Sequence, residues 1–353
     1  MFDGLFDGYT RSILIFAGIN VIAAYSFFAP IKTGQVSLGQ AGFMAVGAYM
    51  SAILTQKFGV PFAAALVAGG VVSGIIGFLV GFPALRIRGI YLLLLTLGFG
   101  EIIQVIALSW DYVGGAQGFR QITYNPRTLD YVAGLIVILV IFFARLERSS
   151  LGRAMDSIHQ DETAAEVMGI DVVRTKLFAF ALGAMIAGLA GGLYAHQATF
   201  MDSSTFNIMV AVEILIFVVV GGSSTYWGPL LGAGFLSLLP EFLRTLREWL
   251  ELVPVAWTDF YPMNKIYDFL YAFLDFENAK RLIAYGLILI VMMIVRPDGL
   301  ITRDSLPRLS FKHWRARHAC TRTRRHLPCD RGAHQAFRRL LRAQRSAVRG
   351  GDR

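Results

Sequence analysis

This 353-residue chain has little charge and almost no cysteine, and both shortages restrict what it can be. Only 16% of its residues are charged, whereas 55% are hydrophobic. That balance gives far more apolar surface than one water-soluble core needs. The two cysteines, Cys320 and Cys329, lie near the carboxyl end at a spacing unlike that of a zinc knuckle. We therefore expect no metal site, and residues 1–310 have no thiol with which to form a disulfide.

The signatures of several enzyme and targeting classes are also missing. The chain has no G-x-x-x-x-G-K-[ST] loop, so it cannot by itself cradle the phosphates of ATP. No apolar run places a histidine beside a serine or aspartate as an intramembrane hydrolase would require. The amino terminus opens with Asp3 and Asp7 and has no basic region, so we predict no cleavable secretory signal. We expect a protein that is not an enzyme and binds no cofactor of its own.

Long apolar runs, in contrast, are abundant, and they predict the fold class. A helix needs about 20 apolar residues to cross the hydrocarbon of a bilayer. The two runs near Trp227-Gly228-Pro229 could instead form a re-entrant hairpin. We predict an all-α polytopic membrane protein with about 8–10 transmembrane or re-entrant helices. The expected spans are residues 11–30, 36–56, 60–83, 89–109, 130–146, 176–198, 207–222, 228–242 and 281–296.

Arginine and lysine predict which loops face the cytoplasm, because short cytoplasmic loops are enriched in both. Basic residues collect at 86–88, at 145–176 and after 296, and an even number of expected spans separates these places. All three should be cytoplasmic. The segments 110–129 and 243–280 then face outward, as does the amino terminus.

The positive charge of the chain belongs entirely to its end. Residues 311–353 contain thirteen Lys and Arg and two Asp, a net charge of +11, whereas the whole chain carries +9. Residues 1–310 therefore carry −2 and form the expected transmembrane domain. The basic tail lacks an apolar helix face and any nucleic-acid motif, so we expect disorder and no nucleic-acid partner. We hypothesise that the tail arose by a frameshift after about Leu300.

A charged segment at residues 147–175 interrupts the apolar runs and is the first candidate site. Its charge density cannot cross a bilayer, and its pattern suits short helices outside the lipid. The small pair Ala164-Ala165, followed by Gly169, predicts a low-profile surface that another protein can approach closely. The expected coupling residues are Gly152, Arg153, Asp161, Glu162, Ala164, Ala165, Glu166 and Gly169.

Polar residues within or beside the apolar spans form the second candidate site. The block GQVSLGQAGF at 34–43 is rich in small and polar residues, which favours either a broken helix along a solute path or close helix packing. Glu101 and Glu213 are acidic residues near the membrane interior, which suggests a cavity or an inter-helix hydrogen bond. The expected path residues are Gln35, Ser37, Gln40, Glu101, Gln104 and Glu213.

Three blocks together resemble the permeases of ABC importers, specifically the branched-chain amino acid (LivM-type) family. They are GQVSLGQAGFMAVGAYMSAIL at 34–54, AAEVMGIDVVRTKLFAF at 164–180 and GGSSTYWGPLLGA at 221–233. The resemblance extends from about residue 34 to 300. Gln40 stands where this family often has histidine, and His159-Gln160 replaces a charged pair, so these positions depart from the family pattern.

The resemblance implies a complete importer around this chain. It predicts a second homologous permease subunit, two cytoplasmic ABC ATPases that bind ATP and Mg²⁺, and an extracytoplasmic solute-binding protein, all at a bacterial plasma (inner) membrane. Segment 147–175 would be the coupling loop to the ATPases. The solute would be a branched-chain amino acid, or urea or a short amide. A proton-coupled secondary transporter is the alternative from another class; it would need an intramembrane carboxylate relay and would leave the loop unused.

Overall fold

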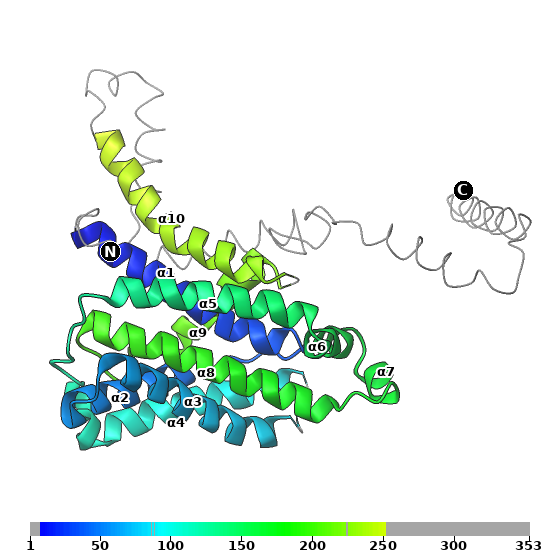
Figure 1. Ribbon diagram of the computed structural model, residues 1–353. Coiled ribbons are helices and arrows are strands. Elements are labelled where there is room, and N and C mark those ends of the chain that lie inside the picture. Colours follow the sequence, from blue (N-terminus) through cyan, green and yellow to red (C-terminus); the bar gives the residue numbers. More distant parts are fainter. Residues whose placement is uncertain (1–7, 86, 88, 224, 252–353) are drawn as a thin grey trace, which may run out of the picture. The chain divides into compact units, whose positions relative to one another are not determined.

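A computed structural model describes residues 8–85, 87, 89–223 and 225–251, and we refer only to these residues below. They form α-helices, two short 3-10 helices and one isolated β-bridge between Phe119 and Met201 (Figure 1). The helices are α1 (Gly8–Ile31), α2 (Gln40–Phe58), α3 (Phe62–Ala84), α4 (Ile90–Ser109), η1 (Asp111–Val113), η2 (Gly115–Gln117), α5 (Thr128–Arg148), α6 (Ser150–Gln160), α7 (Glu162–Val167), α8 (Val172–Ala198), α9 (Ile208–Gly221) and α10 (Trp227–Glu251).

Five of these helices, α1, α3, α4, α5 and α8, are long and apolar enough to cross a membrane. α9 is apolar but has only 14 residues. α2 has 19 residues, and the polar side chains of Gln40, Gln56 and Lys57 at its ends reduce its apolar character. The prediction of an all-α polytopic membrane protein is confirmed.

Eight of the nine predicted spans correspond to described helices, and their boundaries differ for identifiable reasons. α2 begins four residues later than expected because residues 32–39 form a separate linker. α8 begins earlier, at Val172, because the side chain of Asp171 caps its amino end. α10 continues to Glu251, beyond the predicted end at 242, through a sequence of good helix formers. The span expected at 281–296 and the basic tail lie outside the described residues.

α8 lies at the centre of the bundle and packs most extensively against α1, α2 and α3. Its small residues allow this close packing. A Cβ added to Gly191 would overlap the backbone carbonyl oxygen of Met44 in α2. From α3, the Ser73 hydroxyl lies 2.8 Å from the Ala184 carbonyl oxygen in α8 and 3.0 Å from that of Phe43 in α2. The glycines of α8 therefore allow neighbouring helices to pack closely against it.

The helix pair α9–α10 crosses the bundle alongside α1. At one end the Tyr25 hydroxyl donates to the Tyr226 carbonyl oxygen at 2.7 Å, and near the middle the amide of Asn20 donates to the Ser237 hydroxyl at 3.0 Å. At the opposite end the Tyr9 hydroxyl donates to Glu241 at 2.9 Å. α10 thus follows α1 along most of its length in the antiparallel direction, which favours two crossings over a re-entrant hairpin.

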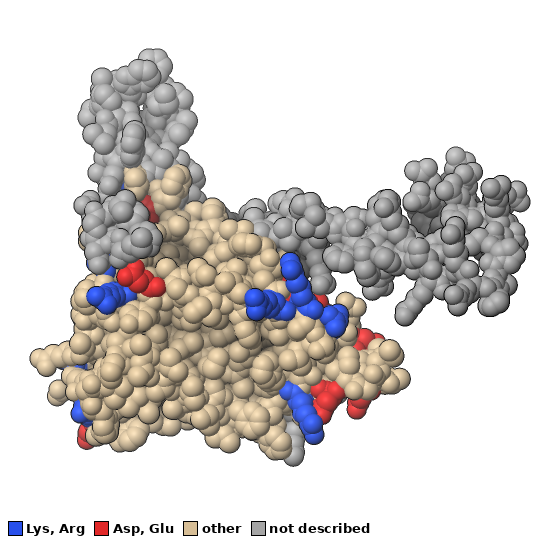
Figure 2. All heavy atoms as spheres, in the orientation of Figure 1, with Lys and Arg blue, Asp and Glu red and all other residues tan. Residues whose placement is uncertain are grey.

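The bundle has two distinct ends. Several elements gather at one end of the bundle, which we call the α6–α7 end. They are the α1–α2 linker, the end of α5, helices α6 and α7, and the α9–α10 turn. Segment 110–127 lies at the opposite end, which we call the 110–127 end, where Lys57 donates to the Tyr112 carbonyl oxygen and Gln56 to that of Arg120. Figure 2 shows charged side chains near both ends of the visible face and an uncharged belt between them. This distribution suits a bundle that spans a bilayer.

Candidate functional site

Helices α6 and α7 form a compact hairpin beyond the membrane-spanning helices (Figure 1). Two side chains define where its helices begin. The Ser149 hydroxyl accepts a hydrogen bond from the Gly152 backbone N–H at 3.1 Å, and Asp161 accepts from Thr163 and Ala164 at 2.9 and 3.1 Å. Such N-caps typically contribute about 1 kcal/mol each. The predicted short helices are therefore present, and their position outside the lipid stays a prediction.

Gly169 reverses the chain between α7 and α8. Its φ is +82°, a left-handed conformation that favours glycine, and a Cβ at this position would meet no atom within 4 Å. The Gly169 N–H donates to the Glu166 carbonyl oxygen at 2.9 Å, and the Ile170 N–H donates to that of Ala165 at 3.1 Å. These bonds close the end of α7 as in an αL helix cap.

The hairpin exposes a different apolar pair from the one predicted. Ala164 is exposed, but Ala165 is only 3% exposed and packs inward, so the two alanines do not form one outer surface. Instead, Val167 and Met168 are 83% and 81% exposed at the tip of the hairpin. Adjacent residues of α7 point about 100° apart, and the narrow side of α7 that packs against the rest of the protein includes Ala165, whereas Ala164 lies on the exposed side.

Charged side chains surround this tip. Lys176 of α8 forms an ion pair with Glu162 of α7, which fixes the hairpin to the start of the long central helix. A hollow of about 460 Å³ lies beside it and is lined by residues of α7, the α7–α8 turn and the start of α8, three of them acidic: Glu162, Glu166 and Asp171. The tip therefore combines two exposed apolar side chains with an acidic rim.

Arg153, another predicted coupling residue, lies on α6 and donates to the Arg148 carbonyl oxygen at 2.9 Å.

Of the predicted path residues, Gln35 and Ser37 lie in the linker between α1 and α2 and Gln40 is the first residue of α2; each is at most 3% exposed. Gln40 accepts a hydrogen bond from the Ser26 hydroxyl at 3.3 Å, and the Leu38 N–H donates to the Thr96 hydroxyl on α4 at 3.0 Å. Buried polar groups need partners in this way. The linker is thus a buried polar break between two helices, and its role in transport stays a prediction.

The other predicted path residues lie elsewhere. Glu101 is exposed on α4, Gln104 is half-buried one turn further along, and Glu213 is half-buried on α9. Because Glu101 is exposed, it does not belong with the buried linker. The sequence could not predict this, because α4 is apolar all round and its pattern does not distinguish a buried face from an exposed one. The structure therefore groups Gln35, Ser37 and Gln40 and places Glu101 on the exposed face of α4.

Sequence reasoning missed an ionic cluster that joins the linker to the hairpin. Lys32 lies directly after α1, and its Nζ is 3.1 Å from Glu147 Oε1 at the end of α5 and 3.5 Å from Asp156 Oδ1 on α6. Glu147 also accepts a hydrogen bond from the Tyr226 backbone N–H at 3.1 Å. The sequence did contain a signal for this cluster: Lys32 directly follows the long uncharged run 12–31, and a charge at such a place needs a partner.

A small polar pocket of about 270 Å³ lies at the 110–127 end. His196, which is 1% exposed, forms its floor together with Thr55; its Nδ1 lies 2.8 Å from the Gly192 carbonyl oxygen and its Nε2 3.1 Å from the Thr55 hydroxyl. Nearby, the Thr205 hydroxyl donates to Asp202 at 2.6 Å, and this bond lowers the pKa of the Asp202 carboxyl. The Thr55–His196 contact joins α2 to α8, whereas the Asp202–Thr205 bond lies within the loop that follows α8.

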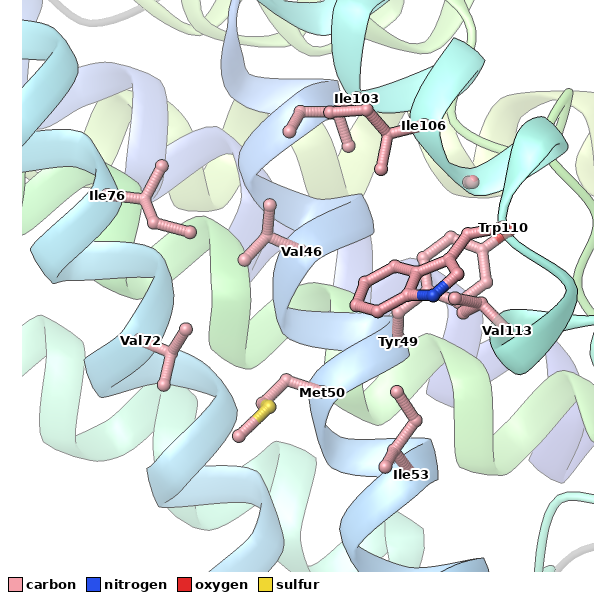
Figure 3. A pocket seen from close by; sticks show the side chains of 11 residues that line it. Val46, Tyr49, Met50, Ile53, Val72, Ile76, Ile103, Ile106, Trp110 and Val113 are labelled. Atoms are coloured by element: carbon pink, nitrogen blue, oxygen red, sulfur yellow. The ribbon is translucent and has the colours of Figure 1, made fainter.

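A second pocket, of about 250 Å³, is almost entirely apolar. It lies between α2, α3, α4 and η1, with the rings of Tyr49 and Trp110 on one side and Val72 and Ile76 on the other (Figure 3). It offers no charged group for an amino or carboxyl group of a solute. Within the described residues no cluster of three His, Cys, Asp or Glu side chains has the arrangement of a metal site.

Comparison of the sequence with known proteins identifies its family. Residues 9–294 match the family described as branched-chain amino acid transport system / permease component. The chain belongs to this permease family. The high-affinity branched-chain amino acid transport system permease protein LivM of Salmonella typhimurium is 32% identical over 339 residues, which cover 86% of this chain and 71% of that protein.

Two further relatives define how broad the similarity is. LivM of Escherichia coli K12 is 31% identical over 339 residues, with the same coverage of both chains. The autoinducer 2 import system permease protein LsrC of Escherichia coli K12 is 28% identical over 200 residues, which cover 53% of this chain and 57% of LsrC. No solved structure matches the chain. The resemblance found in the three sequence blocks is therefore confirmed, and the chain is a multi-pass permease of a transport family.

Proposed function

We propose that this chain is one of two membrane subunits of an ATP-driven ABC importer in a bacterial plasma membrane. Two cytoplasmic ATPases would supply the energy, and an extracytoplasmic binding protein would deliver the solute. The observation that carries the proposal is the α6–α7 hairpin: a capped, charged structure outside the membrane-spanning helices that presents Val167 and Met168 to solvent. Exposed apolar side chains with a polar rim are typical of a protein-docking surface.

The solute we propose is a branched-chain amino acid. The support is the similarity to two LivM proteins over 86% of the chain. Urea or a short amide is the second candidate, because Gln40, directly after the buried linker, departs from the residue that is usual in the family. In addition, LsrC, a relative named for another solute, matches about half of this chain at 28% identity. The separate binding protein would make most of the choice between solutes.

The proposed mechanism starts at the hairpin. Closure of the ATPases on ATP would displace α6 and α7, and Lys176 and the α7–α8 turn would pass that displacement to the central helix α8. Because α8 packs against α1, α2 and α3, a tilt of α8 changes the arrangement of all three. Alternating access to a solute path would follow from that rearrangement.

A proton-coupled secondary transporter is the competing proposal. It would require carboxylates within the membrane that face a cavity or one another. Glu101 is exposed on an outer face of α4 instead. The hairpin would also have no task in such a transporter, whereas an ATPase-docking role accounts for its exposed tip.

The test is uptake by the complete transporter in liposomes that contain ATP. We expect uptake of a radiolabelled branched-chain amino acid to require ATP and to stop when the partner ATPases carry a substitution that blocks hydrolysis. A proton ionophore should leave the initial rate unchanged. Uptake that continues without ATP hydrolysis and collapses with the ionophore would establish the secondary transporter instead.

A further inference from the structure

Lys32 stands at the joint between the α6–α7 hairpin and the buried linker. We propose that Lys32 is a positioning residue that transmits movement of α6 to the linker, which carries Gln35 and Ser37 and leads into Gln40 at the start of α2. The inference rests on the proposed function, because it requires an ATPase that acts on the hairpin. It goes further by naming a specific connection between the site of ATP-driven movement and the predicted solute path.

The ionic contacts of Lys32 are shielded from solvent. The side chains of Lys32, Glu147 and Asp156 are 11%, 18% and 22% exposed. Charges as shielded as these are screened by salt much less than an exposed pair. One ammonium group therefore links the end of α5 and the middle of α6 to the first residue after α1.

On the linker side, Lys32 belongs to the same tight turn as Gln35. The backbone N–H groups of Thr33 and Gln35 both donate to the Pro30 carbonyl oxygen, at 3.0 and 3.1 Å. The Thr33 hydroxyl lies 2.8 Å from the same oxygen and 3.4 Å from Gln35 Oε1. A displacement of Lys32 is thus passed through a short hydrogen-bonded turn to the side chain of Gln35.

A second point of contact supports the connection. Gly34 lies against α6, since a Cβ added to it would be 3.4 Å from His159 Nδ1 and 3.8 Å from His159 Cα. Asp156 and His159 are three residues apart and so lie on the same face of α6. That face of α6 therefore meets the linker at two successive positions, one ionic and one a close backbone approach.

The cluster also extends to the α9–α10 turn. Glu147, which binds Lys32, accepts from the Tyr226 N–H, and the Tyr226 carbonyl oxygen accepts from the Tyr25 hydroxyl of α1. Tyr25 in turn stacks on Phe143 of α5, with 5.3 Å between ring centroids. The carboxylate of Glu147 is therefore shared by the linker and this turn, so loss of Lys32 would release the linker without removing the remaining contacts of Glu147.

The test uses the complete transporter in liposomes and measures two rates, solute uptake and ATP hydrolysis. Lys32→Met keeps the length of the side chain and removes its charge. We expect ATP hydrolysis to stay within about twofold of wild type while uptake per ATP falls about tenfold, in the range typical of coupling between sites. Lys32→Arg, which keeps the charge, should retain most of the uptake per ATP.

Asp156→Asn gives a second, milder variant, because it removes the α6 partner and leaves the Lys32–Glu147 contact. We expect a smaller fall in uptake per ATP, about threefold. The proposal is overturned if Lys32→Met leaves uptake per ATP unchanged, or if both variants lose assembly, hydrolysis and uptake in parallel, which would make the cluster purely structural. Absence of ATP-dependent uptake by the wild-type transporter would instead refute the proposed function, so the two failures are distinguishable.

Discussion

Helices α8 and α5 are both apolar enough to cross a membrane, yet they occupy opposite kinds of position. Their most apolar windows have mean hydropathies of 1.8 and 2.3, but 67% of that window is buried in α8 and only 17% in α5. The difference lies in side-chain size. α8 is rich in glycine and alanine, whereas α5 exposes Val137, Ile138 and Ile141. Hydropathy thus identifies a membrane helix, and small residues determine which helix lies at the centre.

Glycine in the middle of α8 has a cost that close packing must offset. An interior glycine destabilises a helix by about 1 kcal/mol relative to alanine. In exchange, Gly188 and Gly191 let the backbones of α3 and α2 approach α8 to van der Waals contact. The comparison therefore predicts that equal substitutions on α8 and α5 will have very different consequences.

The largest expected effect is at Gly191. Valine at this position would overlap the carbonyl oxygen of Met44, a backbone atom that cannot move without shifting α2. Overpacking of this kind typically costs 1–3 kcal/mol, and we expect roughly 3 kcal/mol or more where backbone is struck. Gly191→Val should therefore abolish the folded permease, measured as the monodisperse fraction after detergent extraction.

Gly134→Val on α5 is the matched control. Gly134 is exposed, and a Cβ added to it would meet no atom within 4 Å. We expect this variant to stay within about 0.5 kcal/mol of wild type, as is usual for exposed positions. Equal yields of the two valine variants would contradict the central placement of α8.

A smaller effect is expected at the tip of the hairpin. Met168 is 81% exposed, so Met168→Glu should not disturb the fold, but a carboxylate there would have to be desolvated in any docked complex. We expect uptake to fall about tenfold, the effect of losing a strong interface residue. Parallel measurements of membrane insertion and uptake at equal expression check both parts of the prediction.

Gln160→Glu supplies the control for charge, because Gln160 is exposed on the same hairpin and away from its tip. This variant should transport at close to the wild-type rate. If Met168→Glu also transports normally, the exposed tip is not the docking surface, and the proposal for the hairpin fails at that residue.

Much of the fold could be predicted from the sequence because hydrophobicity and length dictate membrane helices. The predicted spans agree with α1–α5 and α8–α10 to within a few residues, apart from the longer α10. The extension of α10 was missed because its last turns, which include Arg247 and Glu248, are amphipathic rather than uniformly apolar. Composition alone does not separate such a helix from an interfacial segment.

The candidate site was predictable as a segment but not as a set of contacts. The charge pattern located the hairpin, and its caps follow from Ser149 and Asp161. The inward position of Ala165 depends on the phase of a six-residue helix, which a short sequence does not define. The Lys32 cluster joins residues more than 100 positions apart, a separation that no local pattern encodes.

The account depends most directly on the α6–α7 end of the bundle facing the cytoplasm, where ATP is. With Cys320→Ser and Cys329→Ser as background, the chain has no other cysteine, so a single Cys at Gln160 can be tested with a membrane-impermeant maleimide on intact cells. A Cys at Asn125, at the 110–127 end, serves as the opposite control. We expect label at position 125 in intact cells, and at position 160 only after the cells are opened. Label at position 160 in intact cells would place the hairpin outside and contradict an ATPase-driven mechanism.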